Sequence, residues 1–423
     1  MKHSRMPIAC CKKAMGLCVL FIAFFANAQQ IDFDQYFENR TVGFEYWRVG
    51  CKQWDTIQPR YGSDDFWMKN SEWAGSKTNL VDPFNNGTFC VELREPKTGK
   101  VIYSKGFNTL FQEYCDTPEG DSVVARYEEV VLFPKPKVKV EVVLRRRDAD
   151  LKLQDQKRFV YDPSNHYEYS QVSSVLPEVH KVHYVGDAHH KMDVVIIGQG
   201  YEADNEKLQQ DLAMFKDNLF AVEPFRSHQA DINVWGIAGN VGAEYNTFGA
   251  DRYCMTHHVW DLYHALDHVA FDHIIIMVNS DKYGGGAIYN FYAVSSVHGM
   301  CGKIMPHELG HSIGGLADEY VDENLSYGDI HRRDIEPLEP NITTLVDFDS
   351  KWKSMLPEGT PIPTEPMKKL RPKECGPLGV YEGAGYQKKG IYRPVTNCMM
   401  NYYADFCPVC SRRLEEVIGL YCR

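Results

Sequence analysis

Two histidines and one glutamate in the stretch His307–Tyr320, HELGHSIGGLADEY, are the residues of this chain best suited to chemistry. Side chains four residues apart project from the same face of a helix, so His307 and His311 can share one metal ion. Glu308 follows the first histidine, where its carboxylate can take a proton from a water on the ion instead of binding the ion. This pattern predicts a zinc hydrolase, with Zn²⁺ as cofactor and Glu308 as catalytic base. The same five-residue pattern also arises by chance on ordinary helices, so the rest of the chain must support it.

The residues after the second histidine offer a third ligand. The glycine pair at 314–315 favours the end of a helix and a left-handed turn. Such a turn can carry Asp318 or Glu319 back to the ion, and because neighbours in an extended segment point to opposite sides, only one should reach it. We predict Asp318, whose shorter side chain is the stiffer ligand, with Glu319 orienting its neighbours. If neither residue binds the ion, Glu323 and Glu336 are the later candidates.

The string His-Glu-x-x-His-x-x-x-Gly-Leu-x-Asp-Glu-Tyr resembles the active site of the secreted bacterial metallopeptidases named for IgA cleavage, a metzincin-like family. The chain matches this string at His307, Glu308, His311, Gly315, Leu316, Asp318, Glu319 and Tyr320. In most metzincins the third ligand lies ten residues after the first histidine, where this chain has Ala317, which offers no donor atom. The match to the family string therefore implies that the glycine-rich turn absorbs one extra residue and that Asp318 is the ligand.

A second motif lies in the stretch Thr396–Tyr403, TNCMMNYY. By the same resemblance, Met400 is the methionine that metzincins place in a tight turn beneath the metal. The resemblance also implies that Tyr402, two residues on, can swing toward the metal and stabilise the oxyanion as a catalytic residue. The alternative is that Met399 and Met400 are ordinary core residues.

A glycine run precedes a second extended stretch in the same half of the chain. Gly284–Gly286 let another backbone approach closely, and Tyr292–Val294 is strand-like. If the run lies at the edge strand over the zinc cleft, as the metzincin resemblance implies, a peptide substrate can pair with it as an added strand. The alternative is a flexible loop beside an internal strand.

The elements that must position these residues predict two folded domains. Short aromatic and β-branched runs separated by turns indicate an N-terminal antiparallel β-sandwich over residues 29–150, followed by a polar linker over 151–190. Apolar strand-like runs alternate with helical spacing over 191–423, which predicts a metzincin-like α/β catalytic domain with a mixed sheet. The predicted strands and helices of that domain are Val194–Ile197, Glu206–Phe220, Ile232–Ile237, Trp260–Ala270, His273–Val278 and Ser411–Tyr421.

The first residues indicate export. Basic residues precede the apolar run Ala14–Phe25, and Ala26–Ala28 offers small residues for cleavage, so we predict a signal peptide over 1–28. The alternative is an anchor helix, but the run is shorter than the ~20 residues that a bilayer needs. The mature protein should therefore be secreted, periplasmic or at the cell surface, without stable membrane insertion. Removing four basic residues changes the formal net charge from -11 to -15, which argues against a nucleic-acid partner.

Ten cysteines follow the predicted signal peptide. An even number in an exported protein predicts disulfides, although the sequence does not give their pairing. The pair Cys407-x-x-Cys410 could instead be a redox centre or half of a zinc knuckle, but no second pair of this spacing completes a four-thiolate site.

Together, these features predict a secreted zinc-dependent endopeptidase acting on a polypeptide, such as an immunoglobulin or another host or environmental protein. Zinc would be held by His307, His311 and Asp318. Two alternatives stay open: a zinc amidase acting on cell-wall material, and an inactive exported binding protein built on a peptidase scaffold. The intact Glu308 argues against the second.

Overall fold

The computed structural model describes residues 31–62, 64–164, 168–170, 176–202, 205–322, 330–366, 370–371 and 374–422. The predicted signal peptide lies outside the described residues. Asp32–Arg423 form one compact unit. None of the helices in the described ranges is both long and apolar enough to cross a membrane.

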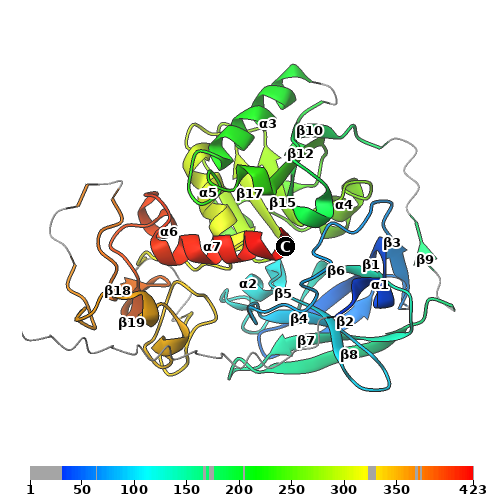
Figure 1. The fold of residues 1–423 in the computed structure, drawn as a ribbon, viewed down its shortest axis with the longest axis horizontal. Coiled ribbons are helices and arrows are strands. Elements are labelled where there is room, and N and C mark those ends of the chain that lie inside the picture. The colour runs from blue at the N-terminus through cyan, green and yellow to red at the C-terminus, as the bar shows by residue number, and fades with distance from the viewer. Residues whose placement is uncertain are drawn as a thin grey trace, which may run out of the picture. The chain divides into compact units, whose positions relative to one another are not determined.

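Two β-sheets dominate the described N-terminal part of the chain (Figure 1). One contains β1 (Phe37–Cys51), β2 (Trp54–Pro59), β3 (Phe66–Met68), β6 (Ala125–Pro136) and β9 (Glu168–Tyr169). The other contains β4 (Phe89–Arg94), β5 (Val101–Phe107), β7 (Val140–Arg147) and β8 (Leu153–Tyr161). The short helices are α1 (Phe33–Tyr36) and α2 (Leu110–Cys115). Phe44 of one sheet and Phe159 of the other have ring centroids 4.5 Å apart, so the aromatic residues of the two sheets form a shared core.

The second half of the chain is built on a six-stranded mixed sheet with the order β10–β12–β11–β15–β17–β16. Its strands are β10 (His180–His183), β11 (Met192–Gln199), β12 (Ile232–Ala238), β15 (His273–Val278), β16 (Gly285–Ile288) and β17 (Tyr292–Ser296). The four inner strands run parallel, whereas β10 and β16 pair antiparallel at the two edges. Most residues of the inner strands are buried and apolar, as expected where both faces of a sheet are covered. The predicted mixed sheet is therefore confirmed.

This half has five helices among its described residues. They are α3 (Glu206–Leu219), α4 (Val259–Ala265), α5 (Cys301–Ser312), α6 (Met399–Tyr402) and α7 (Pro408–Tyr421). Leu208, Leu212 and Phe215 of α3 join one core with residues of α5 and α7. The helix predicted over Trp260–Ala270 ends earlier, and the last helix begins at Pro408, a residue suited to a first helical position.

The remaining elements are short. They are β13 (Ala243–Glu244), β14 (Met255–Thr256), β18 (Tyr381–Ala384), β19 (Gln387–Arg393) and single 3-10 turns at Ala188–His190, Gln229–Asp231, Thr247–Gly249, Phe348–Ser350 and Lys353–Met355. The hairpin β18–β19 lies beside α6 and α7 (Figure 1). Its turn meets the segment after α5, where the Gly385 N–H donates to the Asp318 carbonyl over 2.9 Å.

The predicted linker, residues 151–190, contains strands of both halves. β8 pairs antiparallel with β7 of the N-terminal part, and β10 pairs antiparallel with β12 of the mixed sheet. Most residues of these two strands are only partly buried or exposed, which gives the segment the polar composition of a connection. The predicted domain boundaries stay a prediction.

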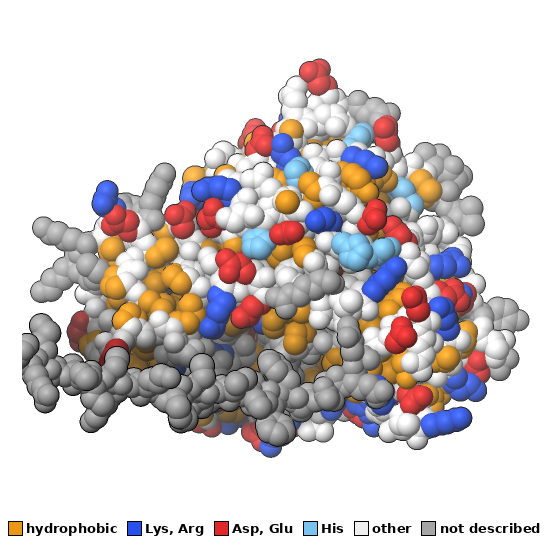
Figure 2. Space-filling view, viewed as in Figure 1, with side chains coloured by type: hydrophobic (Ala, Val, Ile, Leu, Met, Phe, Trp, Pro, Cys, Tyr) orange, Lys and Arg blue, Asp and Glu red, His pale blue; other side chains and the backbone are white. Residues whose placement is uncertain are grey.

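Charged side chains of both signs are mixed on the surface of the molecule. On the face drawn in Figure 2, acidic and basic side chains are interspersed and neither sign forms a large continuous area.

All ten cysteines that follow the predicted signal peptide are free thiols in the structure, so the disulfides expected from the sequence are not present in it. Burial in the packed core accounts for most of these thiols, since eight of the ten are buried.

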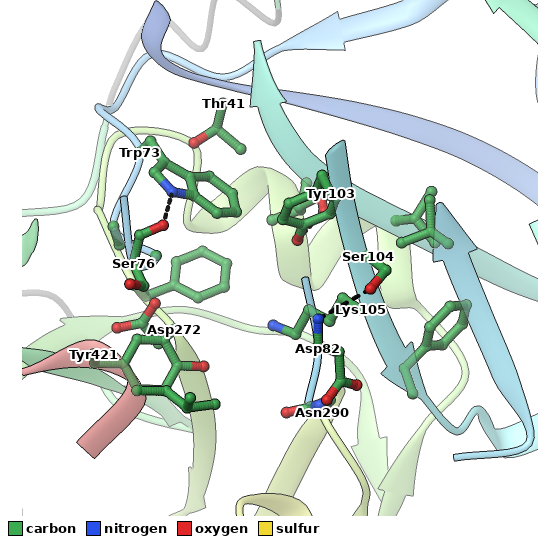
Figure 3. A pocket seen from close by; sticks show the side chains of 18 of the residues that line it. Thr41, Trp73, Ser76, Asp82, Tyr103, Ser104, Lys105, Asp272, Asn290 and Tyr421 are labelled. Carbon is green, nitrogen blue, oxygen red and sulfur yellow. Dashed lines mark hydrogen bonds between the residues drawn. The ribbon is translucent and has the colours of Figure 1, made fainter. Parts of the chain in front are cut away.

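The N-terminal sheets lie directly against the second half of the chain. A cavity of about 130 Å³ lies within this contact, and Figure 3 shows Tyr103 and Lys105 of β5 on one side of it with Asp272 and Tyr421 on the other. Near the mixed sheet, the Asn108 N–H donates to the Tyr289 carbonyl over 2.9 Å. The N-terminal part therefore contacts the chain just beyond edge strand β16.

Candidate active site

Helix α5 brings the two predicted histidines together. The Nε2 atoms of His307 and His311 lie 3.2 Å apart. His307 Nδ1 donates to the Met399 carbonyl over 2.9 Å, and His311 Nδ1 donates to the Leu316 carbonyl over 2.6 Å. Because a carbonyl oxygen only accepts, each Nδ1 carries a proton, which leaves Nε2 as the nitrogen of each ring that can bind a metal ion.

The Asp318 carboxylate completes this group. Its Oδ1 lies 3.2 Å from His307 Nε2 and 3.4 Å from His311 Nε2, and it has no hydrogen-bond partner among the described residues. Ligand atoms about 2.0–2.1 Å from a tetrahedral zinc lie about 3.3–3.4 Å from one another, which matches these separations. Two imidazole nitrogens and one carboxylate oxygen are also donors that zinc prefers, so the donor set fits a zinc ion.

A glycine turn returns the chain to the histidines. Gly315 has φ +59°, its N–H donates to the His311 carbonyl over 2.9 Å, and the Leu316 N–H donates to the Gly310 carbonyl over 3.1 Å. These bonds cap α5 with a left-handed residue, as the sequence predicted. A side chain at Gly315 would also collide with Asn86, whose Nδ2 would lie 2.3 Å from a Cβ there.

Asp318 and Glu319 point to opposite sides of the returning segment. Asp318 Oδ2 accepts a hydrogen bond from the Tyr386 hydroxyl, and Oδ1 faces the histidines. The Glu319 side chain points away from the histidines into the core, where it is fully buried and its Oε1 accepts a hydrogen bond from Asn341 Nδ2 over 2.9 Å. The structure thus places Asp318, and not Glu319, beside the histidines. Glu323 lies outside the described residues, and Glu336 accepts a hydrogen bond from Thr344 over 3.0 Å.

The predicted methionine lies against the helix that carries the histidines. Met400 is fully buried, and its Sδ would lie 2.5 Å from a Cβ at Gly310, so a larger residue there would have to displace the Met400 side chain. The Met400 carbonyl accepts from the Glu319 N–H over 2.8 Å. Together with the bond from His307 to Met399, this contact ties the 399–400 turn to both ends of the site.

The structure does not bring Tyr402 to the histidines. Its side chain is 63% exposed, and it does not line the cleft described below. Tyr403 lines the cleft instead, with its ring 5.6 Å from the His307 ring and its hydroxyl 2.6 Å from that of Tyr283. Tyr403 has φ +51°, and this left-handed position at the end of α6 redirects the side chain. The only indication of Tyr403 in the sequence was its position next to Tyr402.

The buried charges of the site shift one another's protonation. Burial raises the pKa of Glu308, which suits a carboxylate that must accept and release a proton. Burial alone would lower the pKa of His311, but the Asp318 carboxylate outweighs it and raises that pKa to about 9. Burial would raise the pKa of Asp318, but the two histidines hold it well below its usual range.

These residues lie in a cleft of about 710 Å³ that both halves of the chain line. The N-terminal part contributes Asn86, Thr88, Asn108, Gln112, Glu113 and Asp116. Glu113 is half-buried, and its removal from water raises its pKa to about 7, while it accepts a hydrogen bond from the Tyr253 hydroxyl. The sequence predicted no cleft residue in the N-terminal part, because no motif links these positions to the histidines.

Strand β16 forms the wall of the cleft above the helix. A Cβ at Gly285 would lie 3.1 Å from Glu308 Oε1, so this strand passes close to the carboxylate. Gly285 donates to the Arg252 carbonyl and accepts from the Cys254 N–H, each over 3.2 Å. These bonds lie on the edge of β16 that faces away from β17. Because the backbone groups of residues two apart in a strand point to the same edge, the N–H and carbonyl of Ala287 also face away from β17, and Ala287 lines the cleft.

Comparison with known families agrees with this geometry. A family model described as IgA Peptidase M64 matches residues 181–240, 238–376 and 370–418, and a model described as Peptidase M64 N-terminus matches residues 32–158. The chain belongs to the M64 peptidase family. No curated protein is matched by the sequence. His307, His311 and Asp318, whose side chains are close enough together to hold a metal ion, lie within the residues that the IgA Peptidase M64 model matches.

Proposed function

We propose that this M64 peptidase is a zinc-dependent endopeptidase whose site is formed by His307, His311, Asp318 and Glu308. The observation that carries the proposal is the convergence of the two histidine Nε2 atoms and Asp318 Oδ1 within 3.2–3.4 Å of one another. Two imidazoles and one carboxylate leave the fourth position of a tetrahedral zinc open for water or substrate, as hydrolytic zinc sites require.

A bound zinc ion would supply an acidified water and would polarise the scissile carbonyl. Glu308 accepts the proton of that water and passes it to the leaving amine, a task that its raised pKa favours. Tyr403, in place of the predicted Tyr402, supplies a hydroxyl on the cleft side of His307 for the developing oxyanion. The Met399 and Leu316 carbonyls keep the two histidines in the ligating tautomer.

The substrate in this proposal is an extended polypeptide. The edge position of β16 and the outward face of Ala287 support pairing of a substrate backbone along the cleft. The predicted signal peptide supports a location outside the cytoplasm, where exported or environmental proteins, including the IgA that appears in the family description, would be the substrates.

The test combines metal analysis with cleavage of unrelated proteins. The chain purified without chelator should contain zinc and should cleave casein, gelatin or IgA at internal bonds, whereas Glu308→Gln should retain zinc without cleaving them. A peptide library would then give the sequence preference. Zinc at the site with no cleavage of any polypeptide would refute the endopeptidase and leave the cell-wall amidase and the inactive binding protein as the alternatives.

A further inference from the structure

A second group of metal-binding side chains lies behind the segment that carries Asp318. It consists of Glu319, Cys398, Cys407 and Cys410, each with a side chain buried in the core. One donor atom from each residue lies within 4.8 Å of every other. None of these residues takes part in the proposed hydrolysis, so the cluster needs an explanation of its own.

The separations of these donor atoms fit a metal ion better than they fit a covalent bond. Cys398 Sγ lies 3.7 Å from Cys410 Sγ, and Cys410 Sγ lies 3.3 Å from Glu319 Oε1. Two thiolates about 2.3 Å from a tetrahedral zinc lie about 3.8 Å apart, and a thiolate lies about 3.5 Å from a carboxylate oxygen on the same ion. A disulfide needs about 2.05 Å between its sulfurs.

The backbone around the cysteines is arranged to stabilise thiolates. Cys398 precedes α6, and its sulfur accepts from the backbone N–H of Asn401 and, over 3.4 Å, from that of Cys407. Cys407 is the N-cap of α7, and Cys410 follows in its first turn, where the helix dipole favours negative charge. The Cys-x-x-Cys spacing therefore presents two sulfurs from one turn, and Cys398 adds a third.

Glu319 gives an independent indication of a cation. Its side chain is fully buried, and Oε2 has no hydrogen-bond partner among the described residues. Oε1 already accepts from Asn341 and from Cys410. A buried carboxylate oxygen without a partner is costly unless a positive charge lies near it.

A disulfide would satisfy this cluster only in part. Joining any two of Cys398, Cys407 and Cys410 leaves one buried thiol beside Glu319. Cys375, which precedes Cys398 as the nearest cysteine in the sequence, lies outside the cluster, and its thiol donates to the Asp405 carbonyl over 3.3 Å. A four-coordinate ion uses all four donors and leaves no open position, which is the arrangement of a structural zinc site.

We propose that Glu319, Cys398, Cys407 and Cys410 bind a second, structural zinc ion that braces the active site. Glu319 is adjacent to Asp318, and its N–H donates to the Met400 carbonyl. The neighbouring Met399 carbonyl holds His307. The second ion thus fixes the returning segment, the methionine turn and α7 to one another, independently of whether the histidine site hydrolyses peptides.

The test is the zinc content of the full chain purified without chelator or reductant. The wild type should hold two zinc ions, Cys410→Ser one, the double variant His307→Ala/His311→Ala one, and the control Cys375→Ser two. Cobalt loading of the histidine double variant should give the near-ultraviolet thiolate charge-transfer band, and Cys410→Ser should abolish it. A wild type with one zinc that disappears in the histidine variant would refute the second site and leave the proposed function intact.

A second measurement covers the possibility that Cys410→Ser does not fold. The wild-type chain is unfolded with chelator, alkylated without reduction and mapped by mass spectrometry. Cys398, Cys407 and Cys410 should each carry one alkyl group. Disulfide-linked peptides joining any two of them would overturn the proposal, whatever the histidine site contains.

Discussion

The Nε2 atoms of His307 and His311 lie 3.2 Å apart, and the other nitrogen of each ring donates to a backbone carbonyl. The two carbonyls come from Met399 and Leu316, which belong to the methionine turn and the glycine turn. Both turns are therefore parts of the site, because each fixes the tautomer of one histidine. Changes in either turn should affect metal binding even where they touch no donor atom.

The first prediction concerns the base. Glu308→Gln should leave zinc bound and lower kcat by roughly 10²–10⁴-fold, because the amide cannot take a proton from water. Steady-state cleavage of a fluorogenic peptide, with zinc measured on the same sample, checks it. A variant with full activity would place the base on another residue.

The second prediction separates the two adjacent carboxylates. Asp318→Ala should empty the histidine site, because it removes the oxygen that lies 3.2 Å from His307. Glu319→Gln should leave zinc at that site and weaken the proposed thiolate site instead. Zinc content and the cobalt–thiolate band of each variant distinguish these outcomes. If Glu319→Gln empties the histidine site and Asp318→Ala does not, the two assignments are reversed.

The sequence was most informative where function depends on local spacing. His307, Glu308 and His311 share one helix, and helical periodicity alone places them together. Asp318 could be predicted because a glycine turn is also local. Tyr403 could not, since the chain reverses at a non-glycine residue with φ +51°, a conformation that its tertiary contacts maintain.

Features assembled from distant segments were not predictable from the sequence. The cluster of Glu319 with three cysteines joins three separate elements, and the even number of cysteines in a predicted exported protein favoured disulfides that the structure does not contain. Glu113 reaches the cleft from the N-terminal part, and β10 joins the mixed sheet from a segment predicted as a linker. In each case tertiary pairing outweighs the local pattern.

The third prediction distinguishes two neighbouring tyrosines. Tyr403→Phe should lower kcat by roughly 10²–10³-fold, as removal of one oxyanion donor does, with zinc unchanged. Tyr402→Phe is the matched control and should be neutral, because its side chain is 63% exposed. A comparison of kcat and KM for both variants tests the assignment. The opposite ranking would restore the residue predicted from the sequence.

The fourth prediction concerns pH and the contact between the halves of the chain. Lys69 is buried and donates to Ser71 and to the Val269 carbonyl, and burial outweighs Asp267 to lower its pKa to about 7. An unfolded lysine stays protonated to about pH 10.4, so between these values the unfolded state binds the extra proton. Stability should therefore rise with pH, by at most about 1.4 kcal/mol per unit.

Urea unfolding of the wild type and Lys69→Met isolates this contribution, because other titrating groups cancel in the difference. The stability advantage of Lys69→Met should be largest below pH 7 and should shrink as the pH rises toward 10. A difference that does not change with pH would show that Lys69 remains charged in the folded protein.

The last prediction tests pairing of the substrate backbone with β16. Gly285→Val is unsuitable, because a Cβ there would lie 3.1 Å from Glu308 Oε1 and would disturb the base itself. Ala287→Pro removes one N–H on the cleft side of an edge strand, a position where proline is tolerated. It should raise KM for long peptides while zinc content stays unchanged, and Ala287→Ser, which keeps the N–H, should behave like the wild type.

Because the lost contact is a backbone bond, the effect of Ala287→Pro should be the same for peptides of different sequence and should weaken for peptides too short to reach the strand. Equal KM values for Ala287→Pro and Ala287→Ser would mean that the substrate does not pair with this edge.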